Sequence, residues 1–116
     1  MRPEARKYIY DALQAADRLR EFTQGKTFAD YEADALLRSG VERQFSIIGE
    51  SLNRLSRADP ETLARITDHR RIIAFRNLLV HGYDVVDNRV VWGVLESRLP
   101  ALCEQLAAEL AAAGEP

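Results

Sequence analysis

Cysteine, proline and glycine are scarce in this chain, whose 116 residues include one cysteine, four prolines and six glycines. The single cysteine, Cys103, has no partner for an internal disulfide, and we interpret it as a packing residue within a helix. The low glycine and proline content argues against disordered, collagen-like and low-complexity chains. The length predicts one domain, residues 1–116, with a tail that frays from about residue 112.

Long apolar runs are also missing. No apolar stretch approaches the ~18 residues that a membrane-spanning helix needs, and the chain opens with charges at Arg2 and Glu4. The sequence therefore predicts neither a signal peptide nor a transmembrane helix. We expect a cytoplasmic protein that does not contact a membrane.

Side chains suited to binding metals are few. His69, His81 and Cys103 are the only nitrogen and sulfur ligands of this kind, and their spacing is not that of a metal site. The chain also lacks clustered carboxylates for magnesium and the glycine-rich loops that cradle nucleotide phosphates. We therefore expect no metal and no cofactor.

Neither sign of charge dominates, since 16 basic and 18 acidic residues give a formal net charge of -2. A local excess of three positive charges lies between residues 54 and 76, where six arginines face three acids. Arginine binds phosphate with paired donors, but a genome rich in G and C also favours arginine without a functional cause. Two interpretations stay open, an anion-binding surface and a compositional effect. The residues concerned are Arg54, Arg57, Arg65, Arg70, Arg71 and Arg76, with Asp59, Glu61 and Asp68.

Apolar residues recur every three to four positions along most of the chain, and no segment alternates in the manner of a strand. This pattern predicts an all-α fold, an antiparallel bundle of four to five helices. We expect helices over residues 3–24, over 30–58 with Asp30 as its N-cap, and from 69 to 80 or 81, where Gly82 ends the helix. A short helix or turn should follow Asp59–Pro60, and the last helix, from residue 88 or 89, should kink at Pro100.

The segment from Arg76 to Tyr83 places several side chains suited to catalysis or ligand binding at one helix end. It contains a guanidinium, the amide of Asn77, the imidazole of His81 and a phenol. On an ideal helix Arg76 and Tyr83 lie roughly 20° apart, whereas His81 lies about 140° from Arg76. Either the helix unwinds at His81–Gly82, or a second copy of the segment completes a site across a two-fold axis.

Each of these residues also has a purely structural interpretation. His81 suits the negative end of a helix dipole, Arg76 can pair with a carboxylate of the bundle, and Tyr83 can cover the bundle end. Asn77 can simply face solvent. The residues by themselves favour the structural interpretation for Arg76, His81 and Tyr83.

The arrangement of Arg76–Asn77, His81 and Tyr83 resembles the R-x4-H-x-Y motif of HepT-like toxins in the HEPN superfamily. The segment 41–50, with its Ile-Gly-Glu sequence, is similar to that family's second helix, and 99–102 is similar to its last helix. The resemblance covers about residues 7–106 in order. It implies a homodimeric HEPN-like bundle.

The resemblance also implies an activity. Members of this family are metal-independent endoribonucleases, the toxin component of type VII MNT/HepT toxin-antitoxin pairs, and the antitoxin is an MNT-type nucleotidyltransferase. In this chain Arg76 and His81 would be catalytic, with both copies of the motif in one cleft of the dimer. Tyr83 would accept AMP from the antitoxin, which neutralises the toxin.

Other residues are candidates for supporting roles. Asn77 is suited to orient a phosphate or ribose hydroxyl, and Glu50 either pairs with Arg76 or is an ordinary surface or capping carboxylate. The arginines at 54, 57, 70 and 71 would extend an RNA-binding track. The alternative function is a non-catalytic helical dimer that serves as the substrate-binding partner of a nucleotidyltransferase. A structural coiled coil is disfavoured, because glycines and Pro100 interrupt every long heptad run.

Overall fold

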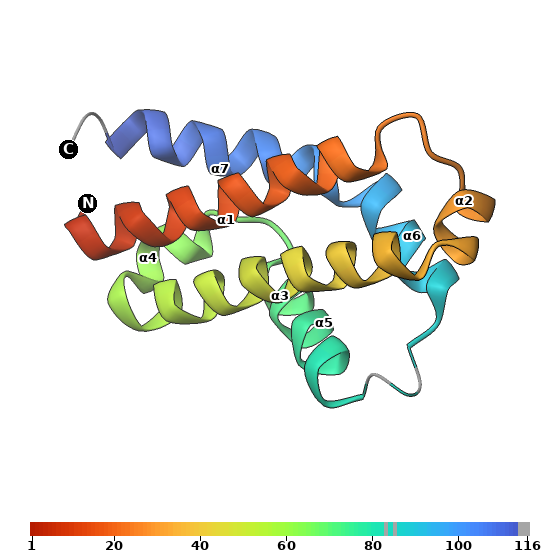
Figure 1. The fold of residues 1–116 in the computed structure, drawn as a ribbon. Helices are drawn as coiled ribbons and strands as arrows, with labels where there is room; N and C mark the ends of the chain where they lie inside the picture. Colours follow the sequence, from red (N-terminus) through yellow and green to blue (C-terminus); the bar gives the residue numbers. More distant parts are fainter. Residues whose placement is uncertain (83, 85, 114–116) are drawn as a thin grey trace.

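The computed structural model of the chain describes residues 1–82, 84 and 86–113. These residues form seven helices and no strand, so the all-α prediction is confirmed (Figure 1). The helices are α1 (Pro3–Thr23), α2 (Phe28–Ala33), α3 (Ala35–Ala58), α4 (Pro60–Ala64), α5 (His69–His81), α6 (Asn88–Ser97) and α7 (Leu99–Ala113).

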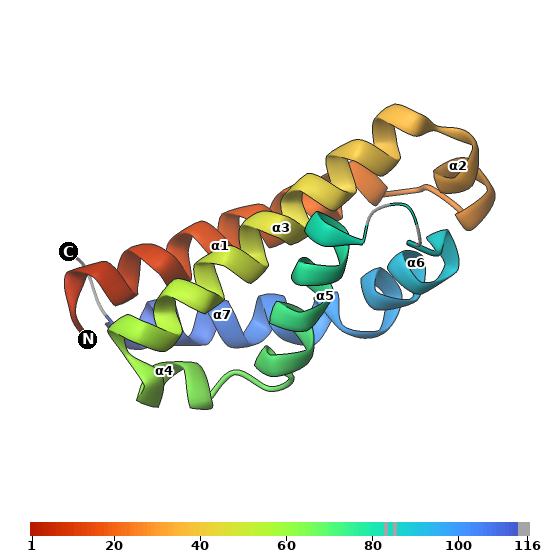
Figure 2. The same ribbon diagram turned by 90° about the horizontal axis from the view of Figure 1, so that it is seen from below.

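Three long helices, α1, α3 and α7, lie side by side along the 42 Å axis of the molecule (Figures 1 and 2). Helix α1 runs antiparallel to both α3 and α7 and packs mainly against these two. Helix α5 crosses α3 at an angle, and α2 and α6 pack together at one end of the bundle. Helix α3 therefore packs against α1 along its length and also carries α5.

The buried face of α1 is made of small side chains with two larger ones, Ile9 and Leu19. Small residues let α3 and α7 approach the α1 backbone closely, which favours tight packing of the three helices. The helix begins at Pro3, where the missing backbone N–H is not needed, and the chain turns at Gly25 with a φ of +72°. The small residues are Ala5, Ala12, Ala15 and Ala16.

The prediction of one helix over residues 30–58 with Asp30 as its N-cap is wrong. Thr27 caps α2 instead: its hydroxyl accepts from the Asp30 N–H at 3.2 Å, and the Asp30 carboxylate accepts from the Thr27 N–H at 2.9 Å. This reciprocal pair makes Asp30 the third residue of a short helix. Asp34 is extended and starts α3, accepting from the Leu37 N–H at 3.1 Å.

The break at Asp59–Pro60 is confirmed. The Asp59 carboxylate caps α4, and Pro60 is its first residue. Asp68 precedes α5 with a φ of +64° but does not cap it through its side chain, which instead pairs with Arg98. Helix α5 then packs its apolar face on α3. The rings of Phe75 and Phe45 lie edge to face there, with their centroids 5.2 Å apart.

The single kinked helix expected after residue 88 is two helices. Helix α6 ends at Ser97 and α7 begins at Leu99, so Pro100 occupies the first turn of α7. A proline is accommodated there because its missing N–H would have no acceptor within the helix. Cys103 is buried among the core residues, as expected of a packing residue, and burial raises the pKa of its thiol. No helix in the described part of the chain is long and apolar enough to cross a membrane.

Candidate functional site

The contact between α3 and α5 centres on Gly49 and Arg76. A Cβ atom placed on Gly49 would lie 2.2 Å from the Arg76 Cβ and 2.5 Å from its Cγ. No residue with a side chain fits this distance, so glycine allows α5 to lie directly on α3. In the sequence, Gly49 is notable only as part of the Ile-Gly-Glu segment. The structure assigns it the contact that places Arg76.

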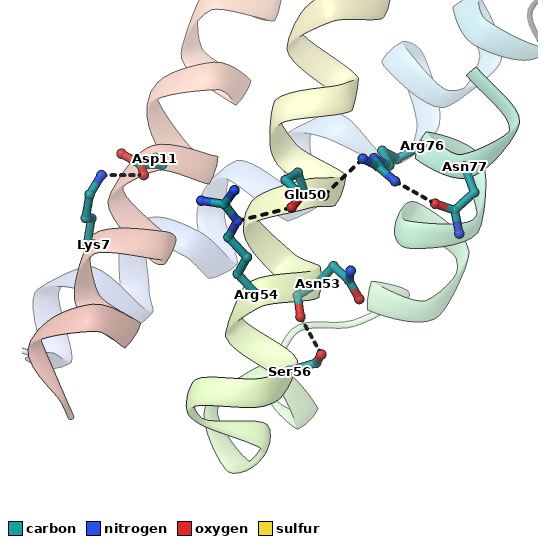
Figure 3. A network of polar contacts seen from close by, with 8 residues as sticks. All are labelled: Lys7, Asp11, Glu50, Asn53, Arg54, Ser56, Arg76 and Asn77. Atoms are coloured by element: carbon teal, nitrogen blue, oxygen red, sulfur yellow. Dashed lines mark hydrogen bonds and ion pairs between the residues drawn. The ribbon is translucent and has the colours of Figure 1, made fainter. Parts of the chain in front are cut away.

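A polar network holds the Arg76 guanidinium (Figure 3). Its Nη2 is 3.0 Å from Oε2 of Glu50, and its Nη1 donates to Oδ1 of Asn77 at 2.9 Å. The other carboxylate oxygen of Glu50 accepts from Nε of Arg54 at 3.1 Å. Of the two interpretations left open for Glu50, the structure shows the pairing with Arg76. One carboxylate serves two guanidinium groups, which leaves this cluster with a net positive charge.

Arg76 is fixed but not closed off. Its side chain is 23% exposed, and its Nε is buried without a hydrogen-bond acceptor in the described structure. The ion pair with Glu50 and the hydrogen bond to Asn77 fix the direction of the side chain, while its exposed part can still reach a ligand. Such a fixed planar cation is suited to bind a phosphate with paired donors.

Arg76 lies on the wall of a groove of about 580 Å³ between α1, α3 and α5. Four arginines from these three helices line it: Arg18, Arg43, Arg54 and Arg76. Among the residues that the structure describes, its other charged side chains are Asp11 and Glu50, so cations outnumber carboxylates by two. The remaining lining residues are Tyr8, Gln14, Ser46, Ile47, Ser51 and Val80.

His81 is exposed and is the last residue of α5. The helix does not unwind before it, since the Gly82 N–H donates to the Leu78 carbonyl at 2.7 Å. On an intact helix the side chains of Arg76 and His81 diverge by about 140°. Arg76 lines the groove and His81 does not. Within one chain, the two predicted catalytic residues therefore lie on the same helix, α5, but on different faces of it. Tyr83 lies outside the described residues.

The candidate RNA-binding arginines fall in different places. Arg54 lines the groove, whereas Arg57 and Arg70 are exposed outside it. Arg71 borders a separate apolar cavity of about 240 Å³ between α3, α5, α6 and α7. Arg65 belongs to the same basic segment but forms two hydrogen bonds to the Glu109 carboxylate, at 2.8 and 2.9 Å.

Sequence reasoning missed Arg18 and Arg43, the two other arginines of the groove. Both follow stripes with helical spacing, 8–11–14–18 on α1 and 43–47–50–54 on α3. A search for polar stripes beside the apolar ones finds these residues. Within residues 1–82, 84 and 86–113, no three histidine, cysteine or acidic side chains are close enough to hold a metal ion.

Comparison with known proteins agrees with the residue pattern. The profile of the family described as "Ribonuclease HepT-like" matches residues 12–109. A protein of Thermococcus cleftensis named "Probable ribonuclease HepT" is 30% identical over 105 residues, covering 88% of this chain and 92% of its own length. A relative from Caldanaerobacter subterraneus, whose name marks RNase activity as inferred, is 29% identical over 101 residues and covers 87% of this chain and 89% of its own.

A third relative, from Methanocaldococcus jannaschii and named in the same way, is 22% identical over 103 residues, covering 89% of this chain and 94% of its own. No solved structure matches the chain significantly. The family profile covers most of the helical bundle, including the whole segment that carries Arg76 and His81. The chain belongs to the HepT-like ribonuclease family of the HEPN superfamily.

Proposed function

We propose that this protein is a metal-independent endoribonuclease, the toxin of a type VII MNT/HepT pair. The observation that supports this most is the Arg76 guanidinium, fixed by Glu50 and Asn77 on the wall of a groove lined by four arginines. A purely structural arginine has no need of three further arginines around it. An exposed imidazole, His81, lies at the end of the same helix.

The proposed reaction is attack of the RNA 2′-hydroxyl on the adjacent phosphorus. One imidazole accepts the hydroxyl proton as the new P–O bond forms and the bond to the 5′-oxygen breaks. The same imidazole, or its copy in the partner protomer, donates a proton to that leaving oxygen. The products are a 2′,3′-cyclic phosphate and a 5′-hydroxyl. Arg76 binds the nonbridging phosphate oxygens, whose negative charge grows in the transition state.

We further propose that two copies of the chain form the active dimer around α3 and α5. Arg76 and His81 diverge on an intact helix. A two-fold axis near the end of α5 would bring Arg76 of one copy close to His81 of the other. Leu78, within the motif but outside the groove, is an apolar side chain that is 40% exposed. Burying it between two copies would stabilise the dimer.

Control by an MNT-type nucleotidyltransferase is part of the proposal. Transfer of AMP to the Tyr83 hydroxyl would add a charged phosphodiester and a nucleoside two residues after His81. Both the charge and the bulk would oppose binding of the RNA backbone there. Asn77 and Arg54 are proposed to contact the substrate directly, and Arg57, Arg70 and Arg71 to contact it farther from the cleaved bond.

The function is tested by incubating the purified protein with RNA in excess EDTA. We expect cleavage, a 2′,3′-cyclic phosphate at the new end, and a mass in light scattering of twice 13.1 kDa. RNA that stays intact with and without Mg²⁺ would favour the non-catalytic alternative. For the antitoxin, intact-mass spectrometry after incubation with the nucleotidyltransferase, ATP and Mg²⁺ should show AMP on the wild type and none on Tyr83→Phe. Equal addition to both would place the acceptor elsewhere.

A further inference from the structure

We infer that the groove between α1, α3 and α5 binds a single-stranded segment of the RNA, with phosphates on Arg18 and Arg43 and one base stacked on Tyr8. This inference rests on the proposed ribonuclease function. It assigns a role in RNA binding to residues outside the R-x4-H motif, two of them, Tyr8 and Arg18, on helix α1. The strand would run along α3 and pass Arg76.

The charges of the groove support an anionic ligand. Both of its carboxylates already have cationic partners, because Asp11 pairs with Lys7 at 3.0 Å and Glu50 pairs with Arg54 and Arg76. Arg18 and Arg43 are exposed and form no ion pair in the described part of the chain. Two guanidinium groups are thus available to bind phosphates without first breaking a salt bridge.

The positions of the two arginines define a direction. Helices α1 and α3 are antiparallel (Figure 1), and Phe22 near the end of α1 lies against Gly40 near the start of α3. Arg18, one turn before Phe22, therefore lies toward the start of α3, and Tyr8 lies toward its end. Arg43 and Arg54 are eleven residues apart, which is about 16 Å along a helix axis. Arg76 contacts α3 between them, at Gly49 and Glu50. Phosphate-binding groups therefore lie on both sides of the proposed reacting phosphate.

Tyr8 supplies the preference for a single strand. Its half-buried ring lines the groove, and its hydroxyl makes no hydrogen bond within the described residues. An aromatic ring among arginines is typical of proteins that bind unpaired strands, because bases stack on the ring while phosphates contact the cations. Bases inside a duplex are stacked on each other and cannot reach it. The groove's volume of about 580 Å³ is that of a small-ligand pocket, which suits a few nucleotides.

The test measures binding, so that it does not depend on cleavage. The probe is a fluorescein-labelled single-stranded 12-mer of 2′-O-methyl RNA, which has no 2′-hydroxyl to attack and stays intact with the wild-type protein. Its dissociation constant is measured by fluorescence anisotropy over a series of salt concentrations, alone and annealed to its complement. Arg18→Gln/Arg43→Gln is compared with Arg2→Gln/Lys26→Gln, which removes the same charge from exposed sites outside the groove.

We expect the groove double variant to bind the probe at least tenfold more weakly. The slope of log K against log salt should decrease by about 1.4, since each phosphate contact on a single strand contributes about 0.7. The control double variant should stay close to the wild type. Tyr8→Ala should weaken binding about fivefold or more, whereas Tyr8→Phe, which keeps the stacking ring, should not. Circular dichroism checks that each variant folds.

Several results would overturn the inference. Equal losses in the groove and control variants would mean that only net charge matters, and equal or tighter binding of the duplex would remove the role of Tyr8. A groove variant that binds RNA normally but no longer dimerises would identify the groove as a protein interface. A wild type that binds the probe through the groove but never cleaves RNA would instead contradict the proposed nuclease and leave the groove assignment standing.

Discussion

Gly49 of α3 and Arg76 of α5 are so close that a Cβ on Gly49 would lie 2.2 Å from the Cβ of Arg76. The next residue on α3, Glu50, then binds the guanidinium of the same arginine at 3.0 Å. Two consecutive residues thus set both the distance of α5 from α3 and the direction of the Arg76 side chain. The Ile-Gly-Glu sequence and the R-x4-H motif meet in space at this point.

Gly49→Ala should destabilise the protein by about 1–3 kcal/mol, the usual cost of forcing extra atoms into a packed contact. Alanine is otherwise the better helix former by about 1 kcal/mol. Gly93→Ala is the matched control, because a Cβ at Gly93 meets nothing within 4 Å. It should stabilise the protein slightly. Urea denaturation followed by circular dichroism measures both, and equal stability of the two variants would contradict the close contact.

Glu50→Gln should separate binding from catalysis. The neutral amide no longer fixes Arg76 by charge, so we expect kcat to fall about tenfold. KM should stay the same or decrease, because the groove loses a negative charge. The free energy of unfolding should change by less than about 1 kcal/mol for such a partly exposed pair. Glu104→Gln, at an exposed position of α7, is the control for the change in net charge. A higher KM with an unchanged kcat for Glu50→Gln would refute the positioning role of Glu50.

His81→Ala should lower cleavage by about 10²–10⁴ with little loss of stability. The imidazole is exposed at the end of α5, so folding should lose only the helix-dipole contribution of about 0.3–1 kcal/mol. His69 begins the same helix and is half-buried, so His69→Ala should do the reverse, reducing stability while the folded fraction cleaves normally. Melting temperature and turnover are measured on the same preparations of both variants. If His81→Ala and His69→Ala lose similar activity, His81 is a packing residue and not a catalytic one.

The Arg65 and Glu109 pair should make stability depend on pH. The two hydrogen bonds from Arg65 lower the pKa of Glu109 below its usual 4.5, so the folded state favours the ionised carboxylate. The pair then stabilises the protein above pH 4.5, and this contribution is lost as the pH falls through the lowered pKa. Glu109→Gln should cost roughly 0.5–1 kcal/mol at pH 7 and nothing at the acid end. A cost that is independent of pH would show that the carboxylate acts only by packing.

The sequence predicts the helices well because their apolar stripes and stop signals are local. The end of α5 at His81 and the break at Pro60 follow from such signals. The capping of α2 was missed because Asp30 is as good an N-cap residue as Thr27, and only the reciprocal hydrogen bonds distinguish them. The sequence places Pro100 inside one kinked helix, whereas the structure has two helices with Pro100 in the first turn of the second, α7. Proline is compatible with both arrangements, so the sequence does not distinguish them.

The site was less predictable because it is made by helices far apart in the sequence. The motif located Arg76, and pairing with it was one of two interpretations of Glu50, but the requirement for Gly49 appears only when α5 lies on α3. Arg18 belongs to a helix without any motif residue, and its role as a lining residue depends on the packing of α1 against α3.

We propose that Arg76 of one protomer and His81 of another form one active site, and mixed dimers test this directly. Arg76→Ala and His81→Ala proteins are purified separately, mixed, unfolded and refolded together, and their cleavage of RNA in EDTA is compared with that of each variant refolded alone. Mixed dimers contain one intact Arg76 and one intact His81 on different chains, so we expect the mixture to recover cleavage that neither variant shows. A mixture that forms dimers but cleaves no faster than the separate variants would contradict it.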